Sequence, residues 1–223
     1  MIIIKDNNQN STNFNDVSIL SFFPNKVITT GEGGMLLTND KRVASKVEML
    51  RNSGITRNNK LFKVKNREAW YYEQQLLGFN YRMTEISGAF GKVQLGKFSS
   101  ILKESKKRYL TFERYISHNQ IKLRHVNLGN EPNYDTFVIS IENKNLRNRV
   151  ISLLNQTGFG TKNLPDAFNW HCAYFWEHID KNIRNKEVKS CYDRLLKCVA
   201  IPILVSRSII DYKNIASYIN ELS

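Results

Sequence analysis

Cysteine is scarce in this sequence of 223 residues, which contains only Cys172, Cys191 and Cys198. Their number is odd and no Cys-x-x-Cys spacing occurs, so the sequence does not favour a disulfide framework. No apolar run approaches the roughly 20 residues that a membrane-spanning helix needs. The apolar start, Met1–Ile4, is too short for a signal peptide and has no small-residue cleavage site. These absences predict a cytoplasmic protein without a membrane span.

Acidic residues are outnumbered, with 20 Asp and Glu against 33 Lys and Arg, which gives a formal net charge of +13. An excess of this size raises nucleic acid as a partner. The basic residues are nevertheless spread along the chain, with only mild clusters at 57–67 and 103–108. We favour a solvated basic surface, then attraction to a phosphorylated or carboxylated small molecule, over nucleic-acid binding.

The pattern of apolar residues over 1–115 predicts alternating strands and helices. Asp40 is expected to cap a helix that ends near Arg51, and a basic, polar loop is expected at 57–73. A helix beginning at Thr84–Glu85 is expected to stop at Gly96, after which a further helix continues to about residue 118. The expected strands of this part are Ile2–Lys5, Val17–Phe22 and Met35–Thr38.

The chain changes character near residues 110–120, and we expect a small α+β domain over 116–223. Period-two alternation predicts strands at 121–126 and 134–141, and a short apolar run predicts another at 199–203. The expected helices are Leu146–Gln156, which Gly158 closes, Lys186–Leu196 and Ser208–Leu222.

The most informative segment is Ser21–Gly34, in which Lys26 follows an apolar strand and precedes a turn with three glycines. A lysine that attacks a carbonyl group must be partly desolvated, so that a neutral amine is available. Glycines let the backbone pass close to a flat ligand. The residue types also fit an ordinary surface turn, and they leave that alternative open.

The order Ser-Phe-x-x-x-Lys-x-x-x-x-Gly-Glu-Gly-Gly resembles the cofactor-lysine motif of the DegT/DnrJ/StrS sugar aminotransferases. Three further motifs resemble that family in the same order: Lys5–Gln9, Arg51–Ile55 and Gly78–Glu85. The resemblance covers residues 1 to about 100 well and the remainder loosely. It implies an α/β fold, the fold-type-I transferase that uses pyridoxal 5'-phosphate. Residues 1–115 would be part of the large cofactor-binding domain and 116–223 the small domain.

The resemblance also assigns catalytic roles. Lys26 would bind the cofactor as a Schiff base and carry a proton between substrate and cofactor carbons. Asp6 would keep the pyridine nitrogen protonated, so that the ring accepts electrons. For Asp6 the alternative is a carboxylate that caps the turn after a strand. Some dehydratases of the family have histidine at the lysine position, so Lys26 indicates amino transfer.

Other residues would bind cofactor and substrate. Gln9 would lie near the cofactor ring, Ser21 would donate to its phosphate, and Asn80 would reach the phosphate of the neighbouring subunit. Arg82 would meet a substrate carboxylate or phosphate with its bidentate fork. The alternatives are an ordinary loop amide for Gln9 and a buried strand hydroxyl for Ser21. For Asn80 the alternative is a turn residue, and for Arg82 it is a structural ion pair.

The segment 161–176 stands where family members carry a substrate loop with proline and histidine, which implies a substrate-binding role for His171. Its sequence, rich in aromatic residues, resembles that of the family branch that aminates an eight-carbon keto sugar acid. The alternative is an aromatic cluster that packs in the core. No pair among His171, Cys172, His178, Cys191 and Cys198 has a standard zinc spacing, so we expect no metal site.

The resemblance implies transfer of an amino group, from glutamate, to a keto sugar in a homodimer. The acceptor would be a nucleotide-linked hexose or a keto-deoxy sugar acid, for surface-polysaccharide or natural-product sugar biosynthesis. Family members have an upstream part with a phosphate-binding helix N-terminus and a stacking aromatic. Without it we expect poor solubility and weak cofactor binding, and rescue by a separate N-terminal chain. Three alternatives stay open: a catalytically inactive fragment, half of a split enzyme acting as a dimerisation partner, and a basic nucleic-acid-binding module.

Overall fold

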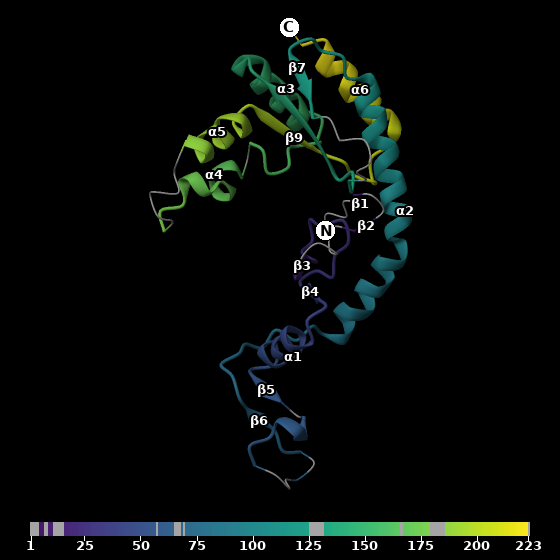
Figure 1. Cartoon of the computed structure of the whole chain (residues 1–223). Coiled ribbons are helices and arrows are strands. Elements are labelled where there is room, and N and C mark those ends of the chain that lie inside the picture. The colour runs from purple at the N-terminus through teal and green to yellow at the C-terminus, as the bar shows by residue number, and fades with distance from the viewer. Residues whose placement is uncertain are drawn as a thin grey trace. The chain divides into compact units, whose positions relative to one another are not determined.

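The computed structural model describes residues 5–6, 9–10, 16–56, 58–64, 68, 70–124, 132–165, 167–178 and 186–222. The chain divides into two compact units, Met1–Phe98 and Ser99–Ser223, and Figure 1 labels helices and strands of both. No helix among the described residues is both long and apolar enough to cross a membrane. The division into a large cofactor-binding domain and a small domain at residue 115 stays a prediction.

The described residues of the first unit form short strands, one complete α-helix, a short 3-10 helix and the beginning of a second α-helix. Its elements in chain order are β1 (Lys5–Asp6), β2 (Gln9–Asn10), β3 (Val17–Ser21), β4 (Gly34–Thr38), α1 (Lys41–Leu50), β5 (Ile55–Thr56), η2 (Asn59–Leu61), β6 (Glu73–Gln74) and the first part of α2 (Glu85–Tyr115). The predicted strand at Ile2–Lys5 falls outside the described residues except for Lys5. The two predicted strands that follow are confirmed as β3 and β4.

Strands β3 and β4 pair antiparallel and are apolar on both faces. Leu20 lies opposite Met35, and Ile19 lies opposite Leu36. Directly opposed residues share a face, and neighbours along a strand point to opposite faces. Each face therefore carries one of these two pairs. An apolar pattern on both faces is typical of strands that are covered on both sides.

Helix α1 begins where the sequence predicts. The Asp40 side chain accepts hydrogen bonds from the N–H groups of Arg42 at 2.7 Å and Val43 at 3.4 Å. These donors have no partner inside the helix, so the cap satisfies them. After Leu50 the chain turns back through Gly54, whose φ of 72° suits glycine.

Helix α2 corrects one prediction. The sequence places a break at Gly96, whereas a single helix of 31 residues runs from Glu85 to Tyr115. The predicted break was wrong, and the predicted start is confirmed. A glycine costs a helix about 1 kcal/mol relative to alanine, but it removes no backbone hydrogen bond. One glycine inside a long helix therefore lowers stability without ending the helix.

The second unit is an antiparallel sheet with helices. Its elements are the remainder of α2, β7 (Ile121–Leu123), β8 (Thr136–Ile141), α3 (Lys144–Gln156), α4 (Phe168–His171), η3 (Ala173–Phe175), α5 (Lys186–Leu195), β9 (Cys198–Pro202) and α6 (Ile209–Asn220). The strand order is β7-β8-β9. The three predicted strands and three predicted helices of this part are confirmed in their described residues, and Gly158 closes α3 with a φ of 71°.

The main hydrophobic core lies in the second unit. Alternate residues of β8 are fully buried, as a half-covered strand requires. They pack with side chains from α2, α3, α6 and β9 in one continuous cluster. The fully buried side chains of this cluster include Phe112, Phe137, Ile139, Ile141, Val150, Leu154, Val199, Ile201, Tyr212, Ala216 and Ile219.

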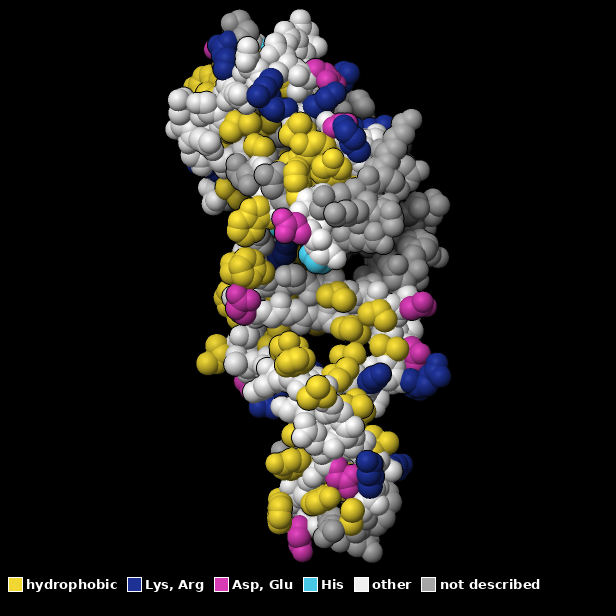
Figure 2. Space-filling model, turned by 90° about the vertical axis from the view of Figure 1, so that its left-hand side faces the viewer, with side chains coloured by type: hydrophobic (Ala, Val, Ile, Leu, Met, Phe, Trp, Pro, Cys, Tyr) yellow, Lys and Arg dark blue, Asp and Glu magenta, His cyan; other side chains and the backbone are white. Residues whose placement is uncertain are grey.

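Large apolar side chains are exposed in the first unit. The exposed fractions reach 79% for Ile19, 89% for Leu77 and 83% for Ile86. Figure 2 shows hydrophobic side chains at the surface in several separate groups. Where such side chains adjoin one another, the surface is typical of a face that another protein covers.

Candidate active site

The loop that carries Lys26 is closed by hydrogen bonds to Phe22. The Phe22 N–H donates to the Gly33 carbonyl at 2.9 Å, and the Phe22 carbonyl accepts from the Thr30 N–H at 3.0 Å. The Thr29 hydroxyl donates to the same carbonyl at 2.8 Å. The Phe22 and Ile28 side chains are buried. The two ends of the loop are therefore fixed, and residues 23–27 project between them.

Lys26 and Ser21 are both accessible on this loop. The Lys26 N–H donates to the Phe23 carbonyl at 3.0 Å, which makes a tight turn around the lysine. The Ser21 hydroxyl accepts from the Phe23 N–H at 3.4 Å. Both side chains are exposed, so the partial desolvation that the sequence predicts for the Lys26 amine is not seen among the described residues. An accessible amine can reach a carbonyl carbon, and an accessible hydroxyl can donate to a phosphate.

The glycine turn after Lys26 brings a second motif into contact with the loop. Gly31 and Gly33 have φ angles of 80° and 145°, which other residues rarely adopt. A Cβ atom on Gly33 would lie 2.8 Å from the Met83 Cε atom and 2.7 Å from the Thr30 Oγ1 atom. Met83 therefore packs against the bare backbone of this turn, and the motif 78–85 lies beside the lysine loop.

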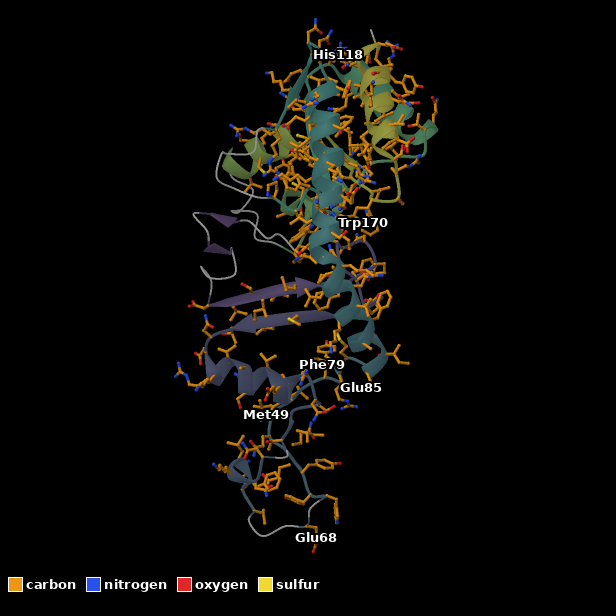
Figure 3. All side chains as sticks on the ribbon, turned by 90° about the vertical axis from the view of Figure 1, so that its right-hand side faces the viewer. Met49, Glu68, Phe79, Glu85, His118 and Trp170 are labelled. Carbon is orange, nitrogen blue, oxygen red and sulfur yellow. The ribbon has the colours of Figure 1, made fainter. Side chains whose placement is uncertain are left out.

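A backbone ladder joins the motifs 51–55 and 78–85. The Ser53 N–H donates to the Phe79 carbonyl at 2.9 Å, and the Phe79 N–H donates to the Leu50 carbonyl at 3.0 Å. The Tyr81 N–H donates to the Arg51 carbonyl at 2.8 Å. Figure 3 labels Met49 near the end of α1, Phe79 in the ladder and Glu85 at the start of α2. Two segments far apart in the sequence are thus locked together.

Two glycines make this close approach feasible. A Cβ atom on Gly78 would lie 2.5 Å from the Gly54 nitrogen and 2.6 Å from the Leu50 carbonyl oxygen. A Cβ atom on Gly54 would lie 1.7 Å from the Leu76 carbonyl oxygen. Side chains cannot be accommodated at either position without moving backbone. The glycines in both motifs are therefore explained by packing between the two segments.

The ladder places Asn80 and Arg82 next to Asn52. Asn52 forms an isolated antiparallel bridge with Asn80, and the Arg82 Nη1 atom donates to the Asn52 Oδ1 atom at 2.6 Å. Asn80 and Arg82 are both exposed. A polar cavity of about 620 Å³ adjoins these groups, and its lining residues are Glu48, Arg51, Asn52, Arg82, Met83 and Glu85. Arg82 thus bonds to an amide rather than to a carboxylate.

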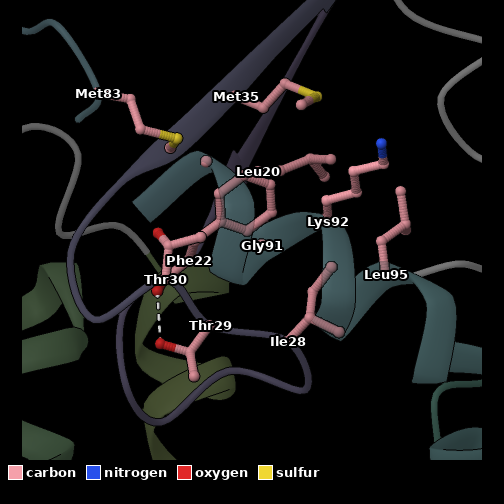
Figure 4. A pocket seen from close by; sticks show the side chains of 11 residues that line it. Leu20, Phe22, Ile28, Thr29, Thr30, Met35, Met83, Gly91, Lys92 and Leu95 are labelled. Atoms are coloured by element: carbon pink, nitrogen blue, oxygen red, sulfur yellow. Dashed lines mark hydrogen bonds between the residues drawn. The ribbon is translucent and has the colours of Figure 1, made fainter. Parts of the chain in front are cut away.

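Met83 also lines an apolar cavity of about 340 Å³ (Figure 4). It is enclosed by the face of the β3–β4 pair that carries Leu20 and Met35, and by one side of α2. Gly91 leaves that side bare, because a Cβ atom there would come within 2.8 Å of the Thr30 Cγ2 atom. The anchors of the lysine loop therefore pack on both the sheet and the helix.

The structure does not test the roles of three of the predicted site residues. Asp6 and Gln9 are paired in β1 and β2, but their side chains lie outside the described part of the chain. His171 ends α4 in the second unit and is exposed. Their roles stay predictions. Ser21, Lys26, Asn80 and Arg82 all belong to the first unit.

The aromatic residues around His171 form a packed cluster, with Tyr192 of α5 at its centre. The Tyr192 ring centroid lies 5.1 Å from those of Phe168 and Tyr174 and 5.2 Å from that of Phe175. Of these four aromatic residues Phe168 is buried and the other three are partly buried, so the choice between a substrate loop and a core cluster stays a prediction. Among the described residues, no three His, Cys, Asp or Glu side chains gather as a metal site would require. The three cysteines are free thiols.

Asn52 is the residue whose role the sequence did not assign. It lies inside one of the four motifs, so its position carried a signal. Its contact with Arg82 joins residues 30 positions apart, and nothing in the local pattern of either segment indicates that pairing. The pairing depends on the ladder, which only the folded chain reveals.

Comparisons with known proteins point to one aminotransferase family. A model of the DegT/DnrJ/EryC1/StrS aminotransferase family matches residues 4–218. The GDP-perosamine synthase of Caulobacter vibrioides is 37% identical over 120 residues, which cover 53% of this chain and 29% of that protein.

Solved structures extend the likeness to nearly the whole chain. The sugar aminotransferase CalS13 from Micromonospora echinospora matches with a TM-score of 0.76 and 17% identity, over 97% of this chain and 55% of that one. Spr1654 from Streptococcus pneumoniae, in its PLP form, matches with a TM-score of 0.70 and 18% identity, over 97% and 55% respectively. The chain thus spans about half the length of these structures. The predicted fold class, a partial fold-type-I transferase, is confirmed.

Proposed function

Because the chain belongs to the DegT/DnrJ/EryC1/StrS aminotransferase family, we propose that it supplies the cofactor lysine of an enzyme that aminates a keto sugar. The cofactor is pyridoxal 5'-phosphate and the amino donor is glutamate. The acceptor is a nucleotide-linked keto hexose or a keto-deoxy sugar acid. The solved PLP form of Spr1654 and the nucleotide-linked amino sugar in the name of the Caulobacter relative support this proposal.

The observation that carries the proposal is the presentation of Lys26. A loop tied at both ends to Phe22 leaves the Lys26 amine accessible, with the Ser21 hydroxyl five residues earlier at the end of β3. These groups fit a cofactor that carries an aldehyde carbon and a phosphate. When bound, pyridoxal phosphate supplies an electron sink for a carbanion. Lys26 would hold the cofactor and then move a proton between substrate and cofactor carbons.

The remaining predicted residues have supporting roles in this proposal. Asp6 holds the proton on the pyridine nitrogen, and Gln9 lies near the ring. Ser21 donates to the cofactor phosphate, and Asn80 of one subunit donates to the phosphate in its partner. Arg82 and His171 contact the substrate, Arg82 through an anionic group.

A homodimer is part of the proposal. Leu77, Phe79 and Ile86 flank Asn80 and are exposed, which is unfavourable in water unless another surface covers them. A second copy that covers this face would also bring Asn80 toward the neighbouring cofactor. A separate N-terminal chain that covers the β3–β4 strands is the further partner expected from the sequence. We place the enzyme in the cytoplasm.

Formation of 2-oxoglutarate from glutamate tests this function without knowledge of the sugar. In a ping-pong reaction without an acceptor, the purified chain with pyridoxal phosphate should form one equivalent of 2-oxoglutarate per site. The end point is measured rather than the rate, because the chain alone is expected to react slowly. Lys26→Ala should abolish the signal, and Lys46→Ala on exposed α1 should leave it unchanged.

Retention of more than about one per cent of the signal in Lys26→Ala would exclude Lys26 as the covalent catalyst, whose loss typically costs orders of magnitude. No 2-oxoglutarate from the folded wild-type chain would favour a catalytically inactive fragment or half of a split enzyme instead.

A further inference from the structure

Two arginines line the polar cavity of about 620 Å³ between the end of α1 and the start of α2. Glu48 and Glu85 line the same cavity, so carboxylate partners for Arg51 and Arg82 are available there. No salt bridge joins either arginine to a carboxylate within the described residues. Arg82 instead donates through Nη1 to the amide oxygen of Asn52 at 2.6 Å.

The Asn52 backbone is held on both sides of this contact. Its N–H donates to the Met49 carbonyl at 3.0 Å at the end of α1. On one side of Asn52, the Arg51 carbonyl accepts from the Tyr81 N–H. On the other side, the Ser53 N–H donates to the Phe79 carbonyl. The amide oxygen therefore starts from a fixed backbone, so its hydrogen bond orients the Arg82 guanidinium.

The Asn52 amide carries no charge, and this determines how much positive charge Arg82 can offer to a ligand. A guanidinium has five N–H donors in one plane, and Asn52 occupies one side of this fork. A carboxylate at the same place would orient the arginine equally well but would cancel its charge. An amide orients the guanidinium and leaves its full positive charge for a ligand.

We propose that Asn52 is a positioning residue that holds Arg82 so that Arg51 and Arg82 together bind one anionic group of the substrate, a phosphate or a carboxylate. The proposed function enters only in the statement that the anion belongs to the substrate. The arginines supply the charge, and Asn52 keeps Arg82 from pairing with Glu48 or Glu85. Charge-assisted hydrogen bonds to such an anion contribute more than neutral ones.

Anion titration of the full chain without cofactor tests the inference. Inorganic phosphate is titrated in one arm and acetate in the other, by calorimetry, and the tighter anion identifies the group that the site takes. We expect Asn52→Ala to weaken binding about fivefold and Arg82→Lys to weaken it about tenfold, which corresponds to about 1.4 kcal/mol. Arg42→Ala is the matched charge control, since its side chain is 94% exposed at the other end of α1, and it should bind like the wild type.

The informative variant is Asn52→Asp. It keeps an acceptor for Arg82 but cancels the charge, so it should bind the anion at least as weakly as Asn52→Ala. Wild-type affinity in Asn52→Asp with loss in Asn52→Ala would show that Asn52 has only a structural role. Unchanged affinity in Arg82→Lys would also overturn the inference.

Two controls separate a loss of anion binding from a loss of structure and from a failure of the proposed function. Amide exchange at Ser53 and Tyr81 reports whether the ladder is intact in each variant. The titration contains no pyridoxal phosphate, so its outcome is independent of Lys26. Normal 2-oxoglutarate formation together with variants that bind the anion like the wild type would refute only this inference. Absence of 2-oxoglutarate formation together with the expected weakening of anion binding would refute only the proposed function.

Discussion

Replacement of Gly78 by alanine tests how the two motif segments are held together. The new Cβ atom would lie 2.5 Å from the Gly54 nitrogen and 2.6 Å from the Leu50 carbonyl oxygen, both backbone atoms that cannot rotate away. Overpacking of this kind costs about 1–3 kcal/mol. The strain falls on the ladder, because separation of the segments lengthens the Phe79-to-Leu50 and Tyr81-to-Arg51 hydrogen bonds of 3.0 and 2.8 Å.

Hydrogen exchange measures this loss locally, whereas a global unfolding curve would mix the two units. A loss of about 2 kcal/mol corresponds to roughly 30-fold more opening. We therefore expect the amides of Ser53, Phe79 and Tyr81 to exchange roughly 30-fold faster in Gly78→Ala.

The matched control is Gly96→Ala, where a Cβ atom would meet nothing within 4 Å. It should leave the ladder amides unchanged and stabilise α2 by about 0.8–1.0 kcal/mol. Ladder exchange within about threefold of the wild type in Gly78→Ala would refute the packing explanation of these glycines.

Two further predictions concern the second unit. Tyr212→Phe should lower the free energy of unfolding by about 1–3 kcal/mol in urea titrations. The fully buried Tyr212 hydroxyl accepts from the Leu204 N–H at 2.7 Å, and its removal leaves that N–H without a partner. Wild-type stability of the variant would contradict this prediction. The Lys107 ammonium and then the Arg108 guanidinium lower the pKa of Glu104 from 4.5 to about 2. A lowered pKa stabilises the fold above the unfolded-state value, so stability should fall between pH 4.5 and about 2. Glu104→Gln should flatten that pH dependence in urea midpoints, and an unchanged slope would exclude Glu104 as its source.

The sequence predicted features that local chemistry decides. The Asp40 cap, the strands β3 and β4 and the glycine end of α3 each follow from a few neighbouring residues. The break expected at Gly96 failed for a different reason. Helical hydrogen bonds continue through a glycine, and the energetic cost of one such residue is small within 31.

The candidate site could be predicted only in part. The motifs named Lys26, Ser21, Asn80 and Arg82, and the structure places all four in the first unit. The sequence did not indicate that Asn52 bonds to Arg82, because the ladder between the segments is a tertiary contact. The accessibility of Lys26 also differs from the desolvated amine that the motif predicted, since desolvation depends on every surface that covers the loop.

Borohydride reduction in the presence of pyridoxal phosphate tests the central claim most directly. Reduction converts an imine between the cofactor and an amine into a stable bond, and peptide mass spectrometry then identifies the modified lysine. If Lys26 is the cofactor residue, the adduct should concentrate on the peptide containing Lys26 and disappear from that site in Lys26→Ala, with Lys46→Ala unchanged. An adduct spread over the surface lysines without preference for Lys26 would contradict the assignment.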